Sequence, residues 1–155
     1  DFVPTVKRIL SKHDVDPGSL ELELSERGVL SGDFEVVEQL KELKILGIRL
    51  SIDDFGTGDS AIAYLRELPV DVLKIDRSYI TGLVDNAKDA ALVSAMVALA
   101  QRLNLRVVAE GVETHEQLSA LRTMNCDAFQ GFLVSQPVPA DAFVSLLKKS
   151  NSNST

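Results

Sequence analysis

The sequence predicts an α/β fold with a parallel sheet, built from the strand–helix units of a (β/α)₈ barrel. Two observations lead to this prediction. Short apolar segments suited to strands alternate with longer segments of helical periodicity. The strand segments begin near residues 20, 48, 70, 105 and 126, a spacing that fits the roughly 31 residues per unit of such a barrel. A doubly wound sheet is the alternative, but no G-x-G-x-x-G motif opens any of the helices.

Helical periodicity and end signals define the helices. Gly47 is placed to end the second helix, Pro69 ends the third, and a T-x-x-Q capping box begins at Thr114. Leu92 and Met96 mark the expected inner face of the longest helix. The expected helices span, in chain order, residues 2–12, 33–46, 61–68, 88–103, about 114–124 and 140–149.

The predicted strands are short and end at polar residues. Leucine alternates with glutamate in the first strand, and the others are apolar runs bounded by turn residues. The expected strands span residues 20–24, 48–52, 70–75, 105–109 and 126–129, with a turn at 16–18 before the first. Residues 150–155 are rich in serine and asparagine and are expected to form a tail or linker.

Length, charge and cysteine content limit the function. The 155 residues, 45% of them hydrophobic, are enough for one domain or part of one with a buried core. The net charge of −7 argues against binding a nucleic acid polymer or an anionic membrane, although bound metal ions could still attract a phosphorylated small molecule. No segment suits a membrane span or signal peptide. Cys126 is the single cysteine, which fits a buried, inert thiol in a cytosolic protein.

Every predicted strand has a polar residue at or near its carboxyl end. In a parallel α/β fold these ends share one rim, where sites are built. Carboxylates gathered there would repel one another unless cations lay between them, and carboxylate oxygens suit Mg²⁺ or Mn²⁺. The residues expected at the rim are Glu23, Asp53, Asp54, Lys74, Glu110, Glu113 and Gln130.

This arrangement favours phosphoryl chemistry, although several of its residues have ordinary alternatives. Two divalent ions a few ångströms apart are suited to in-line displacement at phosphorus. Lys74 would then orient water or neutralise charge on a phosphate oxygen. A single acid at a strand end is more often a helix cap or a solvated loop residue. Phe132 is expected in the core, with stacking on a base as the alternative, and Gly111 and Gly131 are expected to permit tight turns.

Five short motifs follow the order and spacing of those in a known family. They are E-L-S-E at Glu23–Glu26, D-D-F-G-T-G at Asp53–Gly58, L-K-I-D at Leu73–Asp76, A-E-G-V-E at Ala109–Glu113, and Q-G-F at Gln130–Phe132 followed by Pro137. By these motifs the chain resembles the EAL family, bacterial phosphodiesterases that act on cyclic di-GMP. The resemblance covers nearly the whole chain and implies hydrolysis of one phosphodiester bond to give linear pGpG.

The resemblance implies roles for the acids and the lysine. Glu23 and Asp53 would bind a first Mg²⁺ or Mn²⁺ ion, and Asp53 and Asp54 a second. Glu110 would position or deprotonate the attacking water, and Lys74 would help to hold that water.

The resemblance also implies roles for residues around this centre. Gln130 would hydrogen-bond near the water, and Glu113 would lie close to the ligand. Glu26 would anchor the loop 55–60, which in this family couples dimerisation to metal binding. A homodimer or other self-association, and further sensor or signalling domains in a longer parent protein, are therefore expected.

Some family features are absent from the sequence. The namesake Glu-Ala/Val-Leu motif and an upstream asparagine ligand are missing, and Asp59 and Ala61 differ from the usual aromatic residue and serine. Five strands are present where the barrel has eight. Residues 1–149 are therefore expected to be a partial EAL domain, about the last five βα units, that is inactive or nearly so alone. A non-catalytic cyclic di-GMP receptor is the main alternative, and a barrel metalloenzyme acting on another phosphorylated metabolite is the third.

Overall fold

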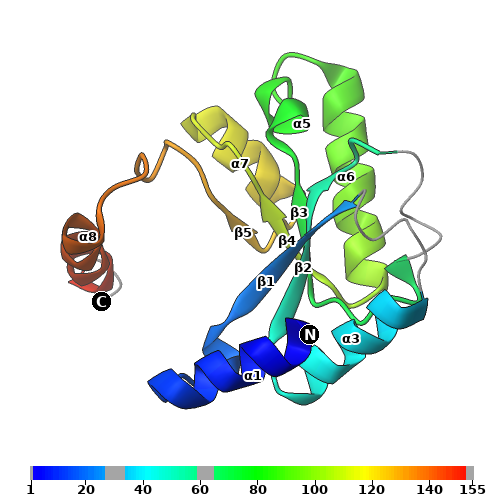
Figure 1. Ribbon diagram of the computed structural model, residues 1–155. Coiled ribbons are helices and arrows are strands. Elements are labelled where there is room, and N and C mark those ends of the chain that lie inside the picture. Colours follow the sequence, from blue (N-terminus) through cyan, green and yellow to red (C-terminus); the bar gives the residue numbers. More distant parts are fainter. Residues whose placement is uncertain (1, 27–33, 59–64, 153–155) are drawn as a thin grey trace.

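The computed structural model of the protein describes residues 2–26, 34–58 and 65–152. Its strands form one parallel five-stranded sheet in the sequential order β1-β2-β3-β4-β5 (Figure 1). Sequential order is typical of a barrel, whereas a doubly wound sheet reverses its order near the middle. The structure is a partial barrel, as predicted. The strands are β1 (Glu21–Ser25), β2 (Arg49–Phe55), β3 (Val72–Ile75), β4 (Arg106–Ala109) and β5 (Ala128–Phe129).

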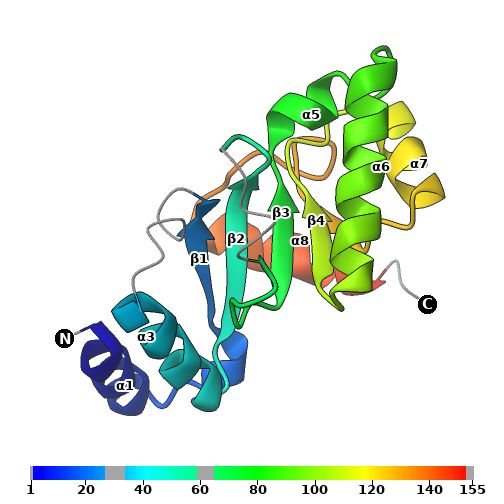
Figure 2. The same cartoon turned by 90° about the vertical axis from the view of Figure 1, so that its right-hand side faces the viewer.

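Helices connect the strands, and α3 and α6 lie on one side of the sheet (Figure 2). The last helix, α8, lies apart from the sheet on the side opposite α6 (Figure 1). In the described part of the chain, no helix combines the length and the apolarity that a membrane span requires. The helices are α1 (Phe2–His13), the 3₁₀ helix η1 (Pro17–Ser19), α3 (Phe34–Ile45), α5 (Arg77–Thr81), α6 (Ala87–Arg102), α7 (His115–Thr123) and α8 (Ala140–Ser152).

The sheet has two chemically different faces. Leu73 pairs with Ile52 on one side and with Val107 on the other, and all three side chains are buried in the core. Because side chains alternate along a strand, the neighbouring Lys74 belongs to the opposite face. The apolar face packs against the helices, and the polar face carries the charged groups towards the inside of the incomplete barrel.

A bulge interrupts β2 at its two aspartates. The register with β3 shifts between Ile52 and Phe55, and Asp54 adopts a left-handed conformation with φ of 54°. Bulges insert an extra residue and redirect side chains, often beside functional sites. Both Ile52 and Phe55 can therefore stay in the core, although the two residues between them are acids.

Two predicted helix ends are confirmed. Gly47 has φ of +94° and follows α3, and the Ile48 amide donates to the carbonyl of Leu43, as in a glycine-terminated helix. Thr114 caps α7, and its side chain and that of Gln117 form the reciprocal capping box.

The structure differs from the predictions in several places. Strand β2 extends to Phe55, so its aspartates lie within the strand, and β5 is only two residues long. Helix α5 was not predicted, because its five residues are too few to show periodicity. Helix α8 extends to Ser152, beyond the expected end at 149. Leu92 on α6 is 46% exposed, and the inner face carries Val93 and Val97 instead. The helix expected at 61–68 lies mostly outside the described residues.

The thiol of Cys126 is expected to react slowly in the folded protein. The side chain is partly buried and lies 3.3 Å from the carbonyl oxygen of Ala128. Burial raises its pKa, so at pH 8 less thiolate is present than for an exposed cysteine. Alkylation by iodoacetamide at pH 8, followed by mass spectrometry, should be at least about tenfold slower in the native protein than in urea. Equal rates would contradict the protection that the structure shows.

Candidate functional site

Lys74 lies at the centre of a group of carboxylates at the carboxyl end of the sheet. Its ammonium nitrogen Nζ is 2.6 Å from Oε1 of Glu23, 2.7 Å from Oε1 of Glu110 and 3.3 Å from Oδ1 of Asp53. These acids come from β1, the residue after β4, and β2, which are far apart in the sequence. The structure thus brings together residues that the strand ends predicted to meet.

Charge balance explains how a lysine can lie within the sheet. The side chain of Lys74 is only 6% exposed. Burial by itself would lower the pKa of Lys74, but hydrogen bonds with Glu110 and Glu23 outweigh it and raise the pKa above its ordinary value. Lys74 is therefore a permanent cation. Burial also raises the pKa of Glu110, and Lys74 opposes that rise.

A second acidic group overlaps the first. Asp53, Asp54 and Glu110 each offer a carboxylate oxygen, and these oxygens lie within 4.8 Å of one another. Oδ1 of Asp53 is buried and has no hydrogen-bond partner among the described residues, although Lys74 pairs with it electrostatically. A buried oxygen of this kind, with two further carboxylates beside it, fits the all-oxygen coordination that Mg²⁺ and Mn²⁺ take. The bulge makes this possible by placing adjacent aspartates at one site.

Asp76 also belongs to this group, although sequence analysis gave it no role. Its carboxylate accepts a hydrogen bond from the Ser78 amide at 2.9 Å and so caps α5, and its negative charge acts on the neighbouring carboxyl of Asp54. The pKa of Asp54 is raised by burial first and then by the neighbouring Asp53 and Asp76. Its position in the sequence could have revealed this role, because Asp76 directly follows β3 and so lies at the same rim as the other acids.

Glu26 fixes the turn that follows the two aspartates. Its side chain is buried, and Oε2 accepts hydrogen bonds from the amides of Gly56 at 2.9 Å and Gly58 at 3.1 Å. A side chain at Gly58 would meet this carboxylate at 3.0 Å. Residues 59 and 60, the end of the expected loop, lie outside the described residues, as does Ala61.

Removing this carboxylate should destabilise the protein. A Glu26→Ala substitution would leave the amides of Gly56 and Gly58 without their acceptor, and hydrogen bonds to a charged group contribute about 1.5–3 kcal/mol each. Because the turn is only partly buried and water can replace part of both bonds, we expect the free energy of unfolding in urea to fall by about 1–3 kcal/mol, less than the sum for two bonds. Glu67→Ala, which removes an exposed carboxylate, is the control. A Glu26→Ala protein as stable as this control would show that the two amides find water instead.

Gln130 connects this centre to the last strand. Its Nε2 donates a hydrogen bond of 2.6 Å to Oε1 of Glu110, the same oxygen that Lys74 approaches. Glu110 is therefore held by two side chains, Lys74 on β3 and Gln130 directly after β5. Its position does not depend on the rotamer of one neighbour alone.

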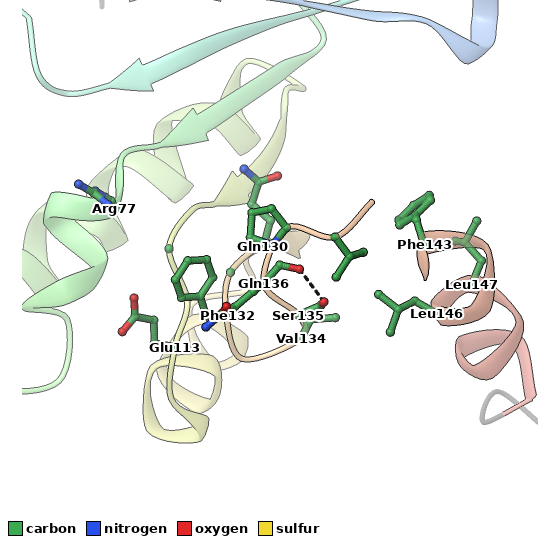
Figure 3. A pocket seen from close by; sticks show the side chains of 14 residues that line it. Arg77, Glu113, Gln130, Phe132, Val134, Ser135, Gln136, Phe143, Leu146 and Leu147 are labelled. Carbon is green, nitrogen blue, oxygen red and sulfur yellow. Dashed lines mark hydrogen bonds between the residues drawn. The ribbon is translucent and has the colours of Figure 1, made fainter. Parts of the chain in front are cut away.

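A pocket of about 690 Å³ adjoins the centre, with Gln130 on its wall. Figure 3 shows Phe132 and Glu113 on one side of it and the α8 residues Phe143 and Leu147 on the other. Glu113 therefore lies in the pocket rather than among the clustered acids. Phe132 is 57% exposed, so the expectation that it lies in the core is wrong. Because β5 ends at residue 129, Phe132 lies in the loop beyond the sheet.

Close packing between backbone segments explains why positions 111 and 131, on the wall of this pocket, are glycines. A Cβ at Gly131 would lie 2.1 Å from the carbonyl oxygen of Val112, and one at Gly111 would lie 2.5 Å from Cβ of Arg77. Gly111 also has φ of +71°, which disfavours a side chain. Both glycines let neighbouring loops approach, and both also line the pocket.

Comparison with known proteins agrees with this geometry. The EAL domain family model matches residues 1–137. The chain is 43% identical over 147 residues to the cyclic di-GMP phosphodiesterase NbdA of Pseudomonas aeruginosa, covering 95% of this chain and 19% of NbdA. The chain thus spans about a fifth of the length of that relative.

Solved structures show the same fold. The PaMucR phosphodiesterase in complex with c-di-GMP superposes with a TM-score of 0.86 at 43% identity, over 91% of this chain and 57% of that one. The manganese/cyclic-diGMP complex of Klebsiella pneumoniae BlrP1 has a TM-score of 0.81 at 32% identity, over 87% and 34%. The family match, the sequence relatives and the shared fold together show that this chain belongs to the EAL domain family.

Proposed function

We propose that this chain is the C-terminal portion of a metal-dependent phosphodiesterase that hydrolyses cyclic di-GMP to linear pGpG. The observation that carries the proposal is the convergence of Glu23, Asp53 and Glu110 on the ammonium group of Lys74. The relative NbdA, a cyclic di-GMP phosphodiesterase, supports the substrate. The BlrP1 complex with manganese supports the kind of metal.

The acids would hold two divalent ions. Glu23 and Asp53 would hold the first, Asp53 and Asp54 the second, and Glu110 would contribute an oxygen beside them. When bound, Mg²⁺ or Mn²⁺ would supply an activated water and neutralise charge on the phosphate. The buried oxygen Oδ1 of Asp53, which finds no hydrogen-bond partner in the described part of the chain, is the feature of this structure that fits such ions most directly.

The protein's own side chains would orient the water and the phosphate. Glu110, whose pKa is raised, would accept a proton from the attacking water, since a base with a pKa nearer neutrality serves better at physiological pH. Gln130 and Lys74 would hold Glu110 in place, and Lys74 would also face negative charge on the phosphate. Phe132 and Glu113, on the wall of the adjoining pocket, would contact the nucleotide.

The test is hydrolysis of cyclic di-GMP by a longer protein that carries this chain, with Mn²⁺ and with EDTA. Chromatography should show pGpG only when the metal is present. We expect the isolated 155-residue chain to be inactive or nearly so, since the family's remaining metal ligands lie outside it. Full activity of the isolated chain would contradict that expectation, and absence of pGpG from the longer protein would contradict the proposed reaction.

A receptor that binds cyclic di-GMP without hydrolysing it is the second candidate. The observation that favours it is the pocket of about 690 Å³, whose aromatic and apolar wall could bind a nucleotide without metal. Calorimetric titration with and without Mg²⁺ separates the two. Equal affinity in both conditions, with no pGpG formed, would favour the receptor.

Cellular context follows from the same proposal. A cytoplasmic location fits a signalling nucleotide and a chain with one cysteine. The longer protein is expected to self-associate and to carry sensor or signalling domains. Residues 1–149 would form its partial EAL domain.

A further inference from the structure

We infer that Tyr79 is a positioning residue for the metal centre, acting through its hydroxyl on the turn after the two aspartates. This inference rests on the proposed metal-dependent function. Tyr79 lies on α5, which begins directly after β3 and its capping residue Asp76, at the end of the sheet where the acids gather (Figure 2). Its hydroxyl donates a hydrogen bond to the carbonyl oxygen of Gly56.

The turn is held from two sides. Glu26, at the end of β1, accepts from the amides of Gly56 and Gly58, while Tyr79 donates to the Gly56 carbonyl from α5. Both polar groups of the Gly56 backbone are therefore bonded to side chains, one from each flanking element. The glycine is required there, because a Cβ would lie 2.8 Å from Cε2 of Tyr79 and 2.6 Å from Cε of Met96.

The clamped turn determines the conformation of Asp54. Asp54 lies two residues before Gly56 and has φ of 54°, and its carbonyl oxygen accepts a hydrogen bond from the Thr57 hydroxyl at 2.9 Å. A left-handed conformation is unfavourable for most residues and persists when the surroundings enforce it. Holding Gly56 in place enforces the bulge, and the bulge places Asp54 beside Asp53 and Glu110.

The inference assigns the hydroxyl a role that the ring does not have. The ring packs against the core and lies beside Gly56, contacts that phenylalanine would keep. A Tyr79→Phe substitution therefore removes one hydrogen bond and little else. Thr81→Val is the matched control, because Thr81 also lies on α5 and its hydroxyl donates to the carbonyl of Arg77 within that helix.

Two measurements on the chain test the inference. In the metal-free protein, hydrogen exchange at the amides of residues 56–58 should be about 3-fold to 10-fold faster in Tyr79→Phe, as loss of one hydrogen bond implies. Mn²⁺ affinity, measured by the electron paramagnetic resonance signal of free Mn²⁺, should fall about tenfold. Thr81→Val should change neither, and the melting temperature of both variants should stay near that of the parent.

The outcomes separate this inference from the proposed function. Unchanged hydrogen exchange at the amides of residues 56–58 would show that Tyr79 does not hold the turn. Faster exchange with unchanged Mn²⁺ affinity overturns the positioning role. If the unsubstituted chain binds no Mn²⁺, the proposed metal site does not form in the isolated chain, and Mn²⁺ affinity is then compared in the longer protein. Hydrogen exchange at residues 56–58 still decides whether Tyr79 holds the turn.

Discussion

A Lys74→Met substitution is expected to lower the rate of cyclic di-GMP hydrolysis by about 10²–10³-fold in a longer protein that carries this chain. Methionine keeps much of the length of the side chain but removes the charge. Glu23, Asp53 and Glu110 would then face one another without their shared cation. The negative charge on the phosphate would also lose the cation that Lys74 supplies.

The same substitution should destabilise the metal-free chain. Breaking a buried ion pair costs about 3–5 kcal/mol, but Glu23 is 52% exposed and its share is screened by water. We therefore expect a loss of about 1–3 kcal/mol in urea unfolding, with partial recovery when Mn²⁺ is added. Lys88→Met, at an exposed position on α6, is the control. Hydrolysis within threefold of the parent would exclude a role for the ammonium group.

Asp53→Asn is expected to have the largest effect on metal binding. Its carboxylate lies between the two groups of acids, beside Lys74 in one and beside Asp54 and Glu110 in the other. If Asp53 is shared by the two proposed ions, replacing its carboxylate with a neutral amide weakens the binding of both. Mn²⁺ stoichiometry should fall, and hydrolysis by the longer protein should drop by at least about 10³-fold.

The control for Asp53→Asn is Asp85→Asn, an exposed aspartate in the segment between α5 and α6. It removes the same charge at an exposed position outside the group of acids. Its Mn²⁺ binding and activity should match those of the parent protein. If Asp53→Asn binds Mn²⁺ as tightly as this control does, the assignment of the metal centre is wrong.

The residues at the strand ends were enough to predict the part of the site that these ends form. The position of Lys74 in an apolar strand, followed by acids after neighbouring strands, was enough to predict one rim. The contact between Glu26 and Gly56 follows from the family resemblance, and no local pattern reveals it. Long-range contacts of this kind depend on how two loops meet.

Other features could not be predicted, for identifiable physical reasons. Strand periodicity places Asp53 and Asp54 on opposite faces, and only the bulge, which depends on pairing with β3, brings them to one site. On α6, Leu92 and Val93 are both apolar, so the pattern alone did not decide which one faces the sheet. Phe132 was expected in the core, with stacking on a base as the alternative, whereas the end of β5 leaves it in a loop.

The contrast between the two faces of the sheet makes the site sensitive to single-residue deletions. Removing one residue from β3 ahead of Lys74 would exchange its inward and outward side chains. The ammonium group would then enter the hydrocarbon core, and Leu73 would face the acids. Insertions and deletions in this strand would therefore disrupt the core and the group of acids together, whereas the segments at the opposite ends of the strands lie away from the acids.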